Sequence, residues 1–203
     1  MPPQVKASGR QARRLQTRER ILGAAIAEFK LSGMAAADVS AIVTAAGVAH
    51  GTFFFHFPTK EHVLLELEQR EEERIAKQLA RTIGPDSDLR STLNEAVRLV
   101  MGLERRLGAV LFKDFLALHF SQTRPSSDES RQHPVIVAVA QEIERAQKQG
   151  AVDPEVTPMN SAVFFLLGLY ALLTTTHDWP GQAAMIEDYV ARTLCSMAAT
   201  GTD

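Results

Sequence analysis

The residues with the clearest capacity for chemistry lie between Thr44 and Lys60, where hydroxyl, imidazole and ammonium groups recur at short spacing. Such groups donate hydrogen bonds to the phosphates and base edges of DNA. The chain has no Gly-x-Ser-x-Gly elbow, no Gly-rich phosphate loop and no His-Glu-x-x-His pair, and its six histidines are scattered. His177 followed by Asp178 suits a helix end and turn better than an acid–base pair. We therefore expect no enzyme, no cofactor and no metal site.

Three short helices are expected to position these donors. The first covers about residues 17–33, with apolar side chains at spacings of three and four. The second is predicted over Val39–Ala46, with Asp38 as its N-cap, and the third over about residues 49–55. Between them Gly47 allows the positive φ of a tight turn. Two helices joined in this way form a helix-turn-helix, which inserts the start of its second helix into the major groove of DNA.

Charge is distributed unevenly along the chain. Residues 1–60 carry eight Lys or Arg and three Asp or Glu, a net +5, whereas residues 61–203 carry fourteen and twenty-one, a net −7. The formal net charge of the whole chain is −2. The N-terminal part alone suits phosphate, and its first basic residues are expected to form a flexible arm that tracks phosphates or enters a minor groove: Lys6, Arg10, Arg13 and Arg14. The alternative is that this basic N-terminus is only a solubilising tail.

Composition narrows the class of protein. An apolar fraction of 45% over 203 residues is ample for a buried core. The single cysteine, Cys195, excludes an intramolecular disulfide and any multi-cysteine zinc site. The N-terminus has no apolar segment typical of a secretory signal, and the longest apolar run, residues 162–173, is well short of the roughly 20 residues of a membrane helix. We expect a soluble cytoplasmic protein with no membrane partner.

The chain beyond residue 60 is predicted to form six further helices, over about residues 60–81, 87–106, 109–120, 135–149, 159–177 and a last one ending near 199. Residues 121–133 are polar and contain Pro and several Ser, which indicates a flexible loop. Because no alternating strand pattern occurs, the expected fold class is all-α with about nine helices. Two domains are expected: a basic arm with a helix-turn-helix DNA-binding domain at 1–60, and a helical body at 61–203.

The eighth helix, residues 159–177, is apolar around its whole circumference, and such a helix must be buried on every side. The ninth is amphipathic. Either the eighth helix is the central core helix of one chain, or one side of it packs against a second subunit. The residues themselves favour neither.

Four motifs in the N-terminal part resemble the TetR/AcrR family of transcriptional regulators. They are TRERIL at residues 17–22, AAGV at 45–48, GT at 51–52 and HFPTKE at 56–61, and together they span about 50 of the 203 residues. The remaining chain resembles the family in its helical layout and in a turn at residues 150–154. The resemblance implies a TetR-like fold, in which residues 61–203 form a ligand-binding and dimerisation domain.

The resemblance also implies a set of DNA contacts, among which the residue types themselves favour Thr52 as a hydroxyl donor and Lys60 as an ammonium at a helix start. The full set is Arg18, Thr44, Ala49, His50, Gly51, Thr52, Phe54, Phe55, His56 and Lys60. Thr44 is either a DNA-backbone contact or a solvated surface threonine.

The chain departs from the family pattern inside the third helix. Ala49 stands in place of a capping serine and His50 in place of a lysine that contacts phosphate. Phe54 and Phe55 replace tyrosines whose hydroxyls bond the sugar-phosphate backbone. Fewer donors predict a weaker affinity for the DNA backbone unless the basic arm compensates.

The resemblance places two further sites in the body. TetR-like regulators pair through their last two long helices, so we expect helices eight and nine to form a homodimer interface that includes Phe164, Leu169, Leu172, Tyr189 and Val190. A small-molecule pocket is implied between helices five and eight, with Asn94, Arg98, Met101, Phe112, Phe115 and His119 as nominated residues. By residue type, His119 is either a satisfied core histidine or a group that orients a ligand.

The leading functional hypothesis is a homodimeric transcriptional regulator that binds a palindromic double-stranded DNA operator. We expect a repressor, released from the operator when a small, largely apolar effector binds the body. The alternative is an all-α ligand carrier or enzyme whose N-terminal module docks to another protein. The charge distribution favours the regulator, because a docking module has no need of +5 in its first 60 residues.

Overall fold

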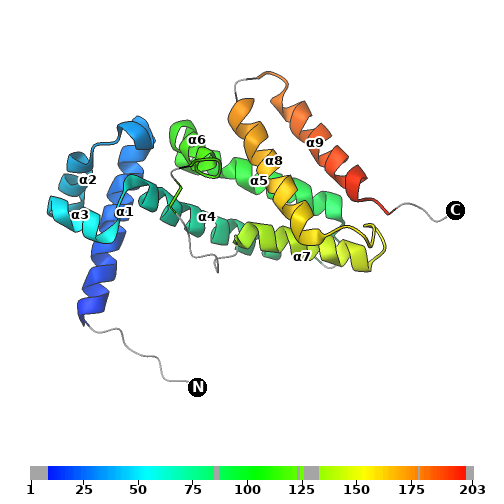
Figure 1. The fold of residues 1–203 in the computed structure, drawn as a ribbon, viewed down its shortest axis with the longest axis horizontal. Coiled ribbons are helices and arrows are strands. Elements are labelled where there is room, and N and C mark those ends of the chain that lie inside the picture. Colours follow the sequence, from blue (N-terminus) through cyan, green and yellow to red (C-terminus); the bar gives the residue numbers. More distant parts are fainter. Residues whose placement is uncertain (1–8, 85–86, 123, 126–132, 178, 200–203) are drawn as a thin grey trace.

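The chain folds as an all-α protein, as the sequence predicts. The computed structural model describes residues 9–84, 87–122, 124–125, 133–177 and 179–199, and within them nine helices and a single isolated β-bridge, Val152 to Ala198, are present (Figure 1). The helices are α1 (Gly9–Ala36), α2 (Val39–Ala46), α3 (His50–His56), α4 (Lys60–Thr82), α5 (Leu89–Leu107), α6 (Ala109–Leu118), α7 (Pro134–Lys148), α8 (Pro158–Thr175) and α9 (Gln182–Met197).

Helix α1 differs most from its expected bounds. It begins at Gly9, so Arg10, Arg13 and Arg14 lie on a regular helix and not on a flexible arm, while Lys6 lies outside the described residues. The helical geometry breaks at Gly33, whose φ of 77° and ψ of 159° leave the last residues as a separate turn. The expected end near residue 33 is therefore confirmed as a kink in α1. Arg10, Arg13 and Arg14 lie on the continuous helix before this kink.

The first three helices enclose a small core at one end of the molecule (Figure 1). Phe29 from α1, Ile42 from α2 and Phe53 from α3 are fully buried in it, together with Phe57 immediately after α3. The N-cap at Asp38 is confirmed, since its carboxylate accepts a hydrogen bond from the backbone N–H of Ser40 at 2.8 Å. These contacts hold α2 and α3 in a defined orientation on α1.

Helix α4 ties these three helices to the rest of the chain. The carboxylate of Glu66 pairs with Arg18 of α1 and lies 2.7 Å from the guanidinium of Arg70, which also pairs with Glu19. Burial acts to raise the pKa of Glu66, but Arg18 and Arg70 outweigh it and hold that pKa below its ordinary value of 4.5. The junction of α1 with α4 is thus a network of ion pairs.

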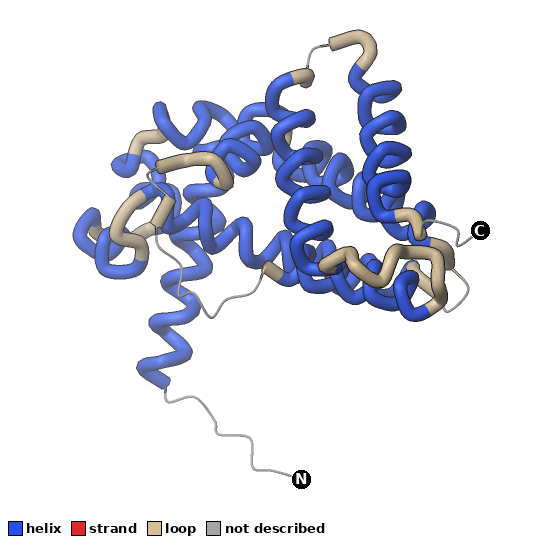
Figure 2. The backbone as a smooth tube through the Cα atoms, turned by 45° about the vertical axis from the view of Figure 1, so that its right-hand side comes forward, coloured by secondary structure: helices blue, strands red, loops and turns tan. Residues whose placement is uncertain are grey.

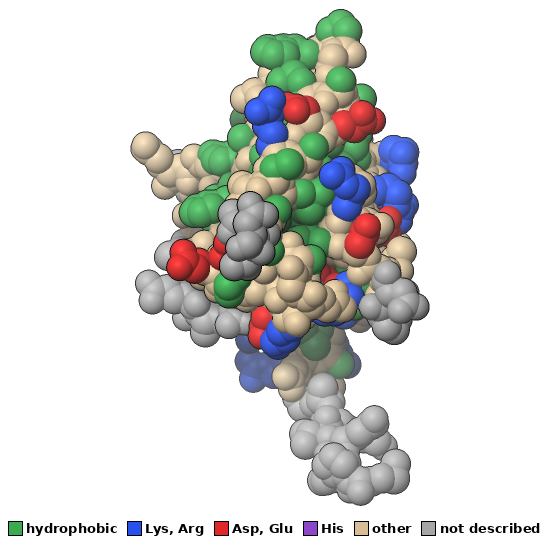
Figure 3. Space-filling view, turned by 90° about the vertical axis from the view of Figure 1, so that its right-hand side faces the viewer, with side chains coloured by type: hydrophobic (Ala, Val, Ile, Leu, Met, Phe, Trp, Pro, Cys, Tyr) green, Lys and Arg blue, Asp and Glu red, His purple; other side chains and the backbone are tan. Residues whose placement is uncertain are grey.

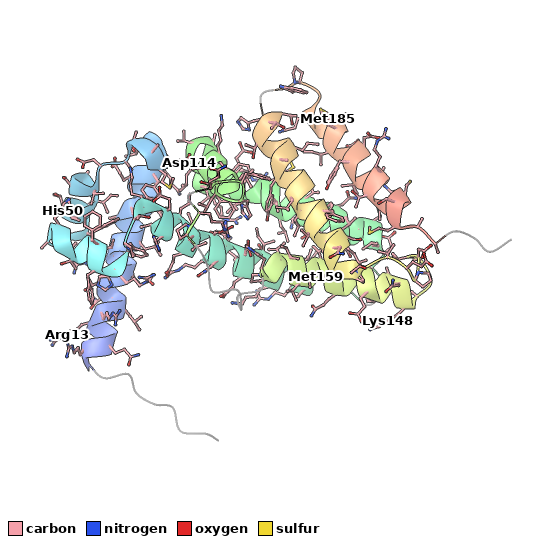
Figure 4. The ribbon with its side chains drawn as sticks, viewed as in Figure 1. Arg13, His50, Asp114, Lys148, Met159 and Met185 are labelled. Carbon is pink, nitrogen blue, oxygen red and sulfur yellow. The ribbon has the colours of Figure 1, made fainter. Side chains whose placement is uncertain are left out.

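A second connection runs from the end of α1 to α6. The carboxylate of Asp114 accepts a hydrogen bond from the backbone N–H of Met34 at 2.6 Å. Figure 4 labels Asp114 on α6. The ammonium of Lys30 donates to the carbonyl of Arg106, the penultimate residue of α5, at 2.7 Å. The C-terminal end of α5 and the middle of α6 are therefore both hydrogen-bonded to α1.

Helices α8 and α9 stand side by side at the opposite end, joined by contacts within one chain (Figure 2). The Tyr189 hydroxyl of α9 donates to the carbonyls of Phe164 and Phe165 at 3.0 and 2.8 Å. Gly168 makes this close approach possible, since a Cβ there would lie 2.3 Å from the Tyr189 hydroxyl. Among the described residues, α8 is also the one helix whose length and apolar composition would suit a membrane span, a test that core helices pass as well.

Of the two alternatives for α8, burial on every side within one chain does not hold. Phe164 is 71% exposed and Leu167 is 37% exposed, whereas Leu169 and Val190 are buried inside the chain. Leu169 and Val190 were expected at a subunit interface, but they face the core because they lie on the sides of α8 and α9 that meet the body. The face that contains α8 and α9 shows hydrophobic side chains among charged ones (Figure 3).

Replacing Glu66 with Gln should lower the free energy of unfolding at pH 7 by about 1–2 kcal/mol, because it removes the charged partner of Arg18 and Arg70. Since the pKa of Glu66 is lowered by folding, this contribution is present above its ordinary pKa and is lost as pH falls through the lowered value. Urea unfolding at a series of pH values measures the difference between wild type and variant, which should shrink in acid.

The matched control is Glu73→Gln, which affects an exposed carboxylate of α4 that pairs with Lys77. We expect a change of well under 1 kcal/mol for this variant. A Glu66→Gln deficit that stays constant from neutral to acid pH would contradict the ion-pair account.

Candidate DNA-binding surface and buried polar cluster

The turn between α2 and α3 orients the start of α3 outward. The axes of the two helices are bent by 95°, and Gly47 adopts the left-handed conformation with φ 61° and ψ 44°. The guanidinium of Arg20 caps the end of α2 by donating to the carbonyls of Ala46 and Gly47. Ala49, the residue before α3, provides no side-chain cap, so the first N–H groups of α3 have no side-chain partner from that residue.

One side of α3 is exposed and carries most of the expected DNA contacts. Ala49, His50, Gly51, Phe54 and Phe55 are exposed, and Thr52 is half-buried. The rings of His50 and Phe54 lie 5.3 Å apart, and His50 projects at the outer edge of this end of the molecule (Figure 4). The structure therefore brings six of the ten residues together on one surface.

The N-terminal part of α1 extends this surface. A groove of about 570 Å³ is lined by Arg10, Gln11, Arg13, Arg14, Thr17, Thr52, Phe55 and His56. The guanidinium of Arg14 lies 5.3 Å from the centre of the Phe55 ring, within the range of a cation–π contact. The arginines of α1 and the exposed side of α3 thus form one continuous basic face, which we call the α1–α3 surface.

Arg18 and His56 do not belong to the exposed part of this surface, and both expectations are corrected. Arg18 pairs with Glu66, donates to the carbonyl of His56 and lies 4.1 Å above the ring of Phe57. His56 is buried and only 8% exposed. Burial, with smaller effects of Arg18 and Arg14, lowers the pKa of His56, so its ring is neutral at pH 7. Both side chains are used inside the fold because α3 ends against α1 and α4.

Lys60 is also engaged within the chain. Its ammonium donates to the carbonyls of Ala35 and Ala37 at 2.8 and 3.1 Å, which are the open carbonyls after the break in α1. Lys60 is half-exposed, so its expected phosphate contact stays a prediction. Thr44 is exposed at the end of α2, with its hydroxyl donating to the carbonyl of Ser40 at 2.8 Å.

The body contains a cavity of about 290 Å³. Its walls are largely apolar and come from α7 and α8: Val135, Ile136, Val163, Leu166, Leu167 and Tyr170. One end is polar and is formed by Glu72, His119, Arg124 and His133. The cavity thus combines an apolar volume with a charged end, an arrangement typical of small-molecule sites.

Four ionisable side chains meet at the polar end, and we call them the Glu–His cluster: Glu68, Glu72, His119 and His133. His119 Nε2 lies 2.7 Å from Glu68 Oε1 and 3.7 Å from Glu72 Oε1, and His133 Nδ1 lies 2.8 Å from Glu72 Oε1. Arg124 approaches Glu68 Oε2 at 2.9 Å from the other side. Two histidines that look unrelated in the sequence therefore share one site.

The cluster changes the charge states of its members. Burial opposes protonation of His119, but the carboxylates of Glu68 and Glu72 outweigh it and raise the pKa of His119 to about 9. The carboxylate of Glu72 raises the pKa of His133. Burial acts to raise the pKa of Glu72, yet its contacts with His119 and His133 lower it. At pH 7 the cluster is thus an ion-paired group inside the body.

The residues nominated for the pocket are mostly elsewhere. Asn94 and Arg98 are exposed on α5, where Arg98 pairs with Glu95 at 2.6 Å, and Met101 is half-buried outside the cavity lining. Phe112 and Phe115 are buried in the core and do not line the cavity either. His119 alone of the six lines it. Helix α5 turns its apolar side inward, so Asn94 and Arg98 lie on its exposed side, away from the interior.

The sequence reasoning missed Glu68, Glu72, Arg124 and His133. One signal was present, because Glu68 and Glu72 lie one turn apart between Leu67 and Ile75, within the apolar stripe of α4. Two acidic residues in such a stripe are rarely buried without a partner.

Comparison with known proteins supports the class of this fold. Residues 21–67 match the family model described as "Bacterial regulatory proteins, tetR family". No curated protein sequence matched the chain. FadR of Thermus thermophilus, described as a TetR family transcriptional repressor in complex with lauroyl-CoA, matches with a TM-score of 0.71 and 22% identity over 91% of this chain and 97% of that chain.

Two further structures match at similar coverage. RolR in complex with resorcinol gives a TM-score of 0.72 and 16% identity over 93% of this chain and 91% of that chain. FadR of Bacillus subtilis in complex with stearoyl-CoA gives 0.65 and 16% identity over 88% and 98%. At these identities the likeness concerns the fold. The helix-turn-helix part of the chain, residues 21–67, therefore matches the tetR family of bacterial regulatory proteins, and the chain as a whole has the fold of the TetR-like structures above.

Replacing Phe115 with Ala should cost about 3–5 kcal/mol of unfolding free energy. The ring of Phe115 extends from α6 into the packed core and does not line the cavity. Thermal or urea unfolding measures this loss. Phe120→Ala is a suitable control, since Phe120 is 51% exposed, and it should change stability by less than about 1 kcal/mol. A loss at Phe115 no larger than that at Phe120 would mean that the cavity extends behind the ring.

Proposed function

We propose that this protein is a homodimeric regulator that binds an operator through the α1–α3 surface and responds to a small ligand in the body. The observation that carries the proposal is the single exposed face shared by α3 and the arginines of α1. The start of α3 offers backbone N–H groups and His50, while Arg10, Arg13 and Arg14 offer positive charge beside it. We propose residues 1–60 as the DNA-binding domain and residues 61–203 as the ligand-binding and dimerisation domain.

In the proposed complex, α3 enters the major groove with its exposed side toward the bases. His50 and Thr52 are its polar side chains, and Phe54 and Phe55 offer apolar contact of the kind that thymine methyl groups accept. The arginine row of α1 would supply phosphate contacts beside one from Lys60, since Arg18 pairs with Glu66 and His56 is buried. The sequence-independent part of the affinity would thus come mainly from α1.

The cavity is the proposed effector site. Related folds are described in complex with lauroyl-CoA, stearoyl-CoA and resorcinol, which are organic molecules of different size. At about 290 Å³ the cavity of this chain suits a small, largely apolar molecule with a polar group directed at the Glu–His cluster. We propose that such a ligand releases the protein from DNA, as a repressor in the cytoplasm, and that the protein has no enzymatic activity.

Two connections are available to couple the cavity to the α1–α3 surface. Helix α4 carries Glu72 at the cavity and Glu66 at the ion pairs with α1. The segment from α6 to its C-cap carries His119 at the cavity and Asp114 at the backbone of Met34. Ligand and DNA would weaken each other's binding by the same factor, with a coupling free energy of about 1–3 kcal/mol.

The proposed dimer forms through the outer side of α8 and α9. Phe164 is exposed there, and a shallow groove follows the two helices, lined by Ser161, Phe164, Phe165, Gly168, Tyr189, Arg192, Thr193, Ser196 and Met197. Large exposed apolar side chains rimmed by polar ones are typical of protein–protein interfaces. A second copy of the same two helices would cover them and place two α1–α3 surfaces on one DNA site.

Arg13→Gln should weaken binding to duplex DNA and flatten the dependence of log K on log salt by about one unit, because it removes one phosphate contact. Fluorescence anisotropy with a labelled duplex selected from a random pool measures both quantities. Lys148→Gln is the matched control, since Lys148 is an exposed cation on α7, far from α3 (Figure 4). Equal salt slopes for Arg13→Gln, Lys148→Gln and wild type would refute the α1–α3 surface.

Phe164→Glu should convert a dimer into folded monomers, because an unpaired carboxylate buried in the interface costs several kcal/mol while the same group is solvated in the monomer. Light scattering reports the mass and circular dichroism the helix content. Leu31→Glu places the same charge at an 82% exposed leucine of α1 and should leave the mass unchanged. A wild-type protein that is monomeric at micromolar concentration would rule out this interface.

A further inference from the structure

The Glu–His cluster has the composition and the size of a metal site. One ligand atom from each of Glu68, Glu72, His119 and His133 lies within 4.8 Å of the other three, and the four come from α4, the C-cap of α6 and the N-cap of α7. Glu68 and Glu72 are one turn apart, so their carboxylates lie on the same side of α4. This juxtaposition is independent of the α1–α3 surface.

The cluster also lacks hydrogen-bond partners for its most buried ring. The side chain of His119 is 7% exposed and faces the cavity, and neither of its ring nitrogens has a partner with hydrogen-bond geometry among the described residues. The side chains of Glu68 and Glu72 are 1% and 5% exposed. Two buried carboxylates, and a buried imidazole that lies close to them but is poorly oriented for hydrogen bonding, are costly unless a cation or better-oriented donors satisfy them.

We propose that Glu68, Glu72, His119 and His133 bind one divalent first-row transition-metal ion, of which Zn²⁺ is the best fit. Two carboxylate oxygens and two imidazole nitrogens form a four-ligand set that Zn²⁺ accepts. The imidazoles disfavour Mg²⁺ and Ca²⁺, which prefer oxygen ligands alone, and the absence of a thiolate disfavours Cu⁺. The single cysteine, Cys195, is exposed on α9 and does not line the cavity.

The spacing of the ligand atoms allows a single ion. Two ligands of one tetrahedral Zn²⁺ lie about 3.4 Å apart, because the ion bonds to nitrogen and oxygen at about 2.1 Å. Side-chain movements that shorten the longest ligand–ligand distance by about 1.4 Å would bring the four atoms from within 4.8 Å to this spacing. Two negative charges from Glu68 and Glu72 would balance the charge of the ion. Arg124, which approaches Glu68 from the opposite side, is a competing cation.

The inference goes beyond the proposed function, since the relatives cited above are described with organic ligands. A bound ion would join α4, α6 and α7 at the polar end of the cavity. It would therefore fix the helix that carries Glu66 relative to the helix that carries Asp114.

Titration of the untagged full-length protein, freed of metal with a chelator, tests the site. Co²⁺ serves as the spectroscopic probe, and Zn²⁺ is added as its competitor. We expect saturation at one ion per chain, visible ligand-field bands from Co²⁺ that Zn²⁺ abolishes, and a rise in Tm of about 5–10 °C at a metal concentration near 100 Kd. No saturable Co²⁺ spectrum in the wild-type protein would overturn the proposal without reference to any variant.

Variants locate the ion. Glu72→Gln and His119→Gln should each weaken Co²⁺ binding by at least about tenfold, and circular dichroism confirms that they are folded. His177→Gln is the matched control, because His177 also neighbours a carboxylate, Glu104 at 3.6 Å, but lies outside the cluster. Arg124→Gln should instead tighten binding, since it removes the competing cation. Equal affinities in wild type, Glu72→Gln, His119→Gln and His177→Gln would place the metal elsewhere and overturn the assignment.

Duplex DNA binding of the metal-free protein is measured on the same samples. A protein that binds DNA but not Co²⁺ overturns the metal site and leaves the proposed function intact. A protein that binds Co²⁺ with the expected variant pattern but does not bind DNA supports the metal site and contradicts the proposed function.

Discussion

Two carboxylates buried in the middle of α4 are the constraint on which the body of this protein depends. Glu68 and Glu72 lie where a helix of this length would ordinarily present leucines, and a buried charge without a partner costs several kcal/mol. Their neutralisation requires that the end of α6 and the start of α7 meet beside α4, because His119 and His133 lie at those helix ends. The polar end of the cavity therefore results from the two buried carboxylates of α4. Helix α7, which begins at this cluster, and α8 form the apolar walls.

The same helix carries its charges in two groups with different partners. Glu66 faces α1 and holds Arg18, whereas Glu68 and Glu72 face the body. Because these groups are only two to six residues apart on one helix, a rotation of α4 changes both sets of contacts together. A second path exists through α6, where Asp114 contacts α1 and His119 contacts the cluster. In the proposed function, a ligand in the cavity would act on two helices that both contact α1.

Capping and turn preferences of neighbouring residues predict α2 and α3 well. They do not predict which polar side chains from different helices bond to one another. Asp38, the bounds of α2, and the left-handed Gly47 follow from residue types a few positions apart, so they could be predicted. The roles of Arg18, His56 and Lys60 could not, because each depends on where a carbonyl or carboxylate of another helix ends up. The resemblance assigned DNA contacts to these positions, but the fold uses donors of Arg18 and Lys60 internally and buries the ring of His56. The Glu–His cluster could not be predicted from the sequence for the same reason, since Glu72 and His133 are 61 residues apart in the chain.

Two phenylalanines of α3 depart from the family pattern, Phe54 and Phe55, and Phe55 lies beside the arginines at the start of α1. Phe54 and Phe55 are 45% and 67% exposed, and they lack the hydroxyls that the family pattern supplies at these positions. Phe55 instead receives the guanidinium of Arg14 on its ring, and this contact restricts a flexible cation to the edge of α3. A neutral hydrogen bond to phosphate contributes about 1 kcal/mol, whereas a charged group near the DNA backbone also releases a counterion. In the proposed complex, the arginines at the start of α1 would supply charge in place of the missing hydroxyl donors, and the affinity for DNA would then depend more strongly on salt.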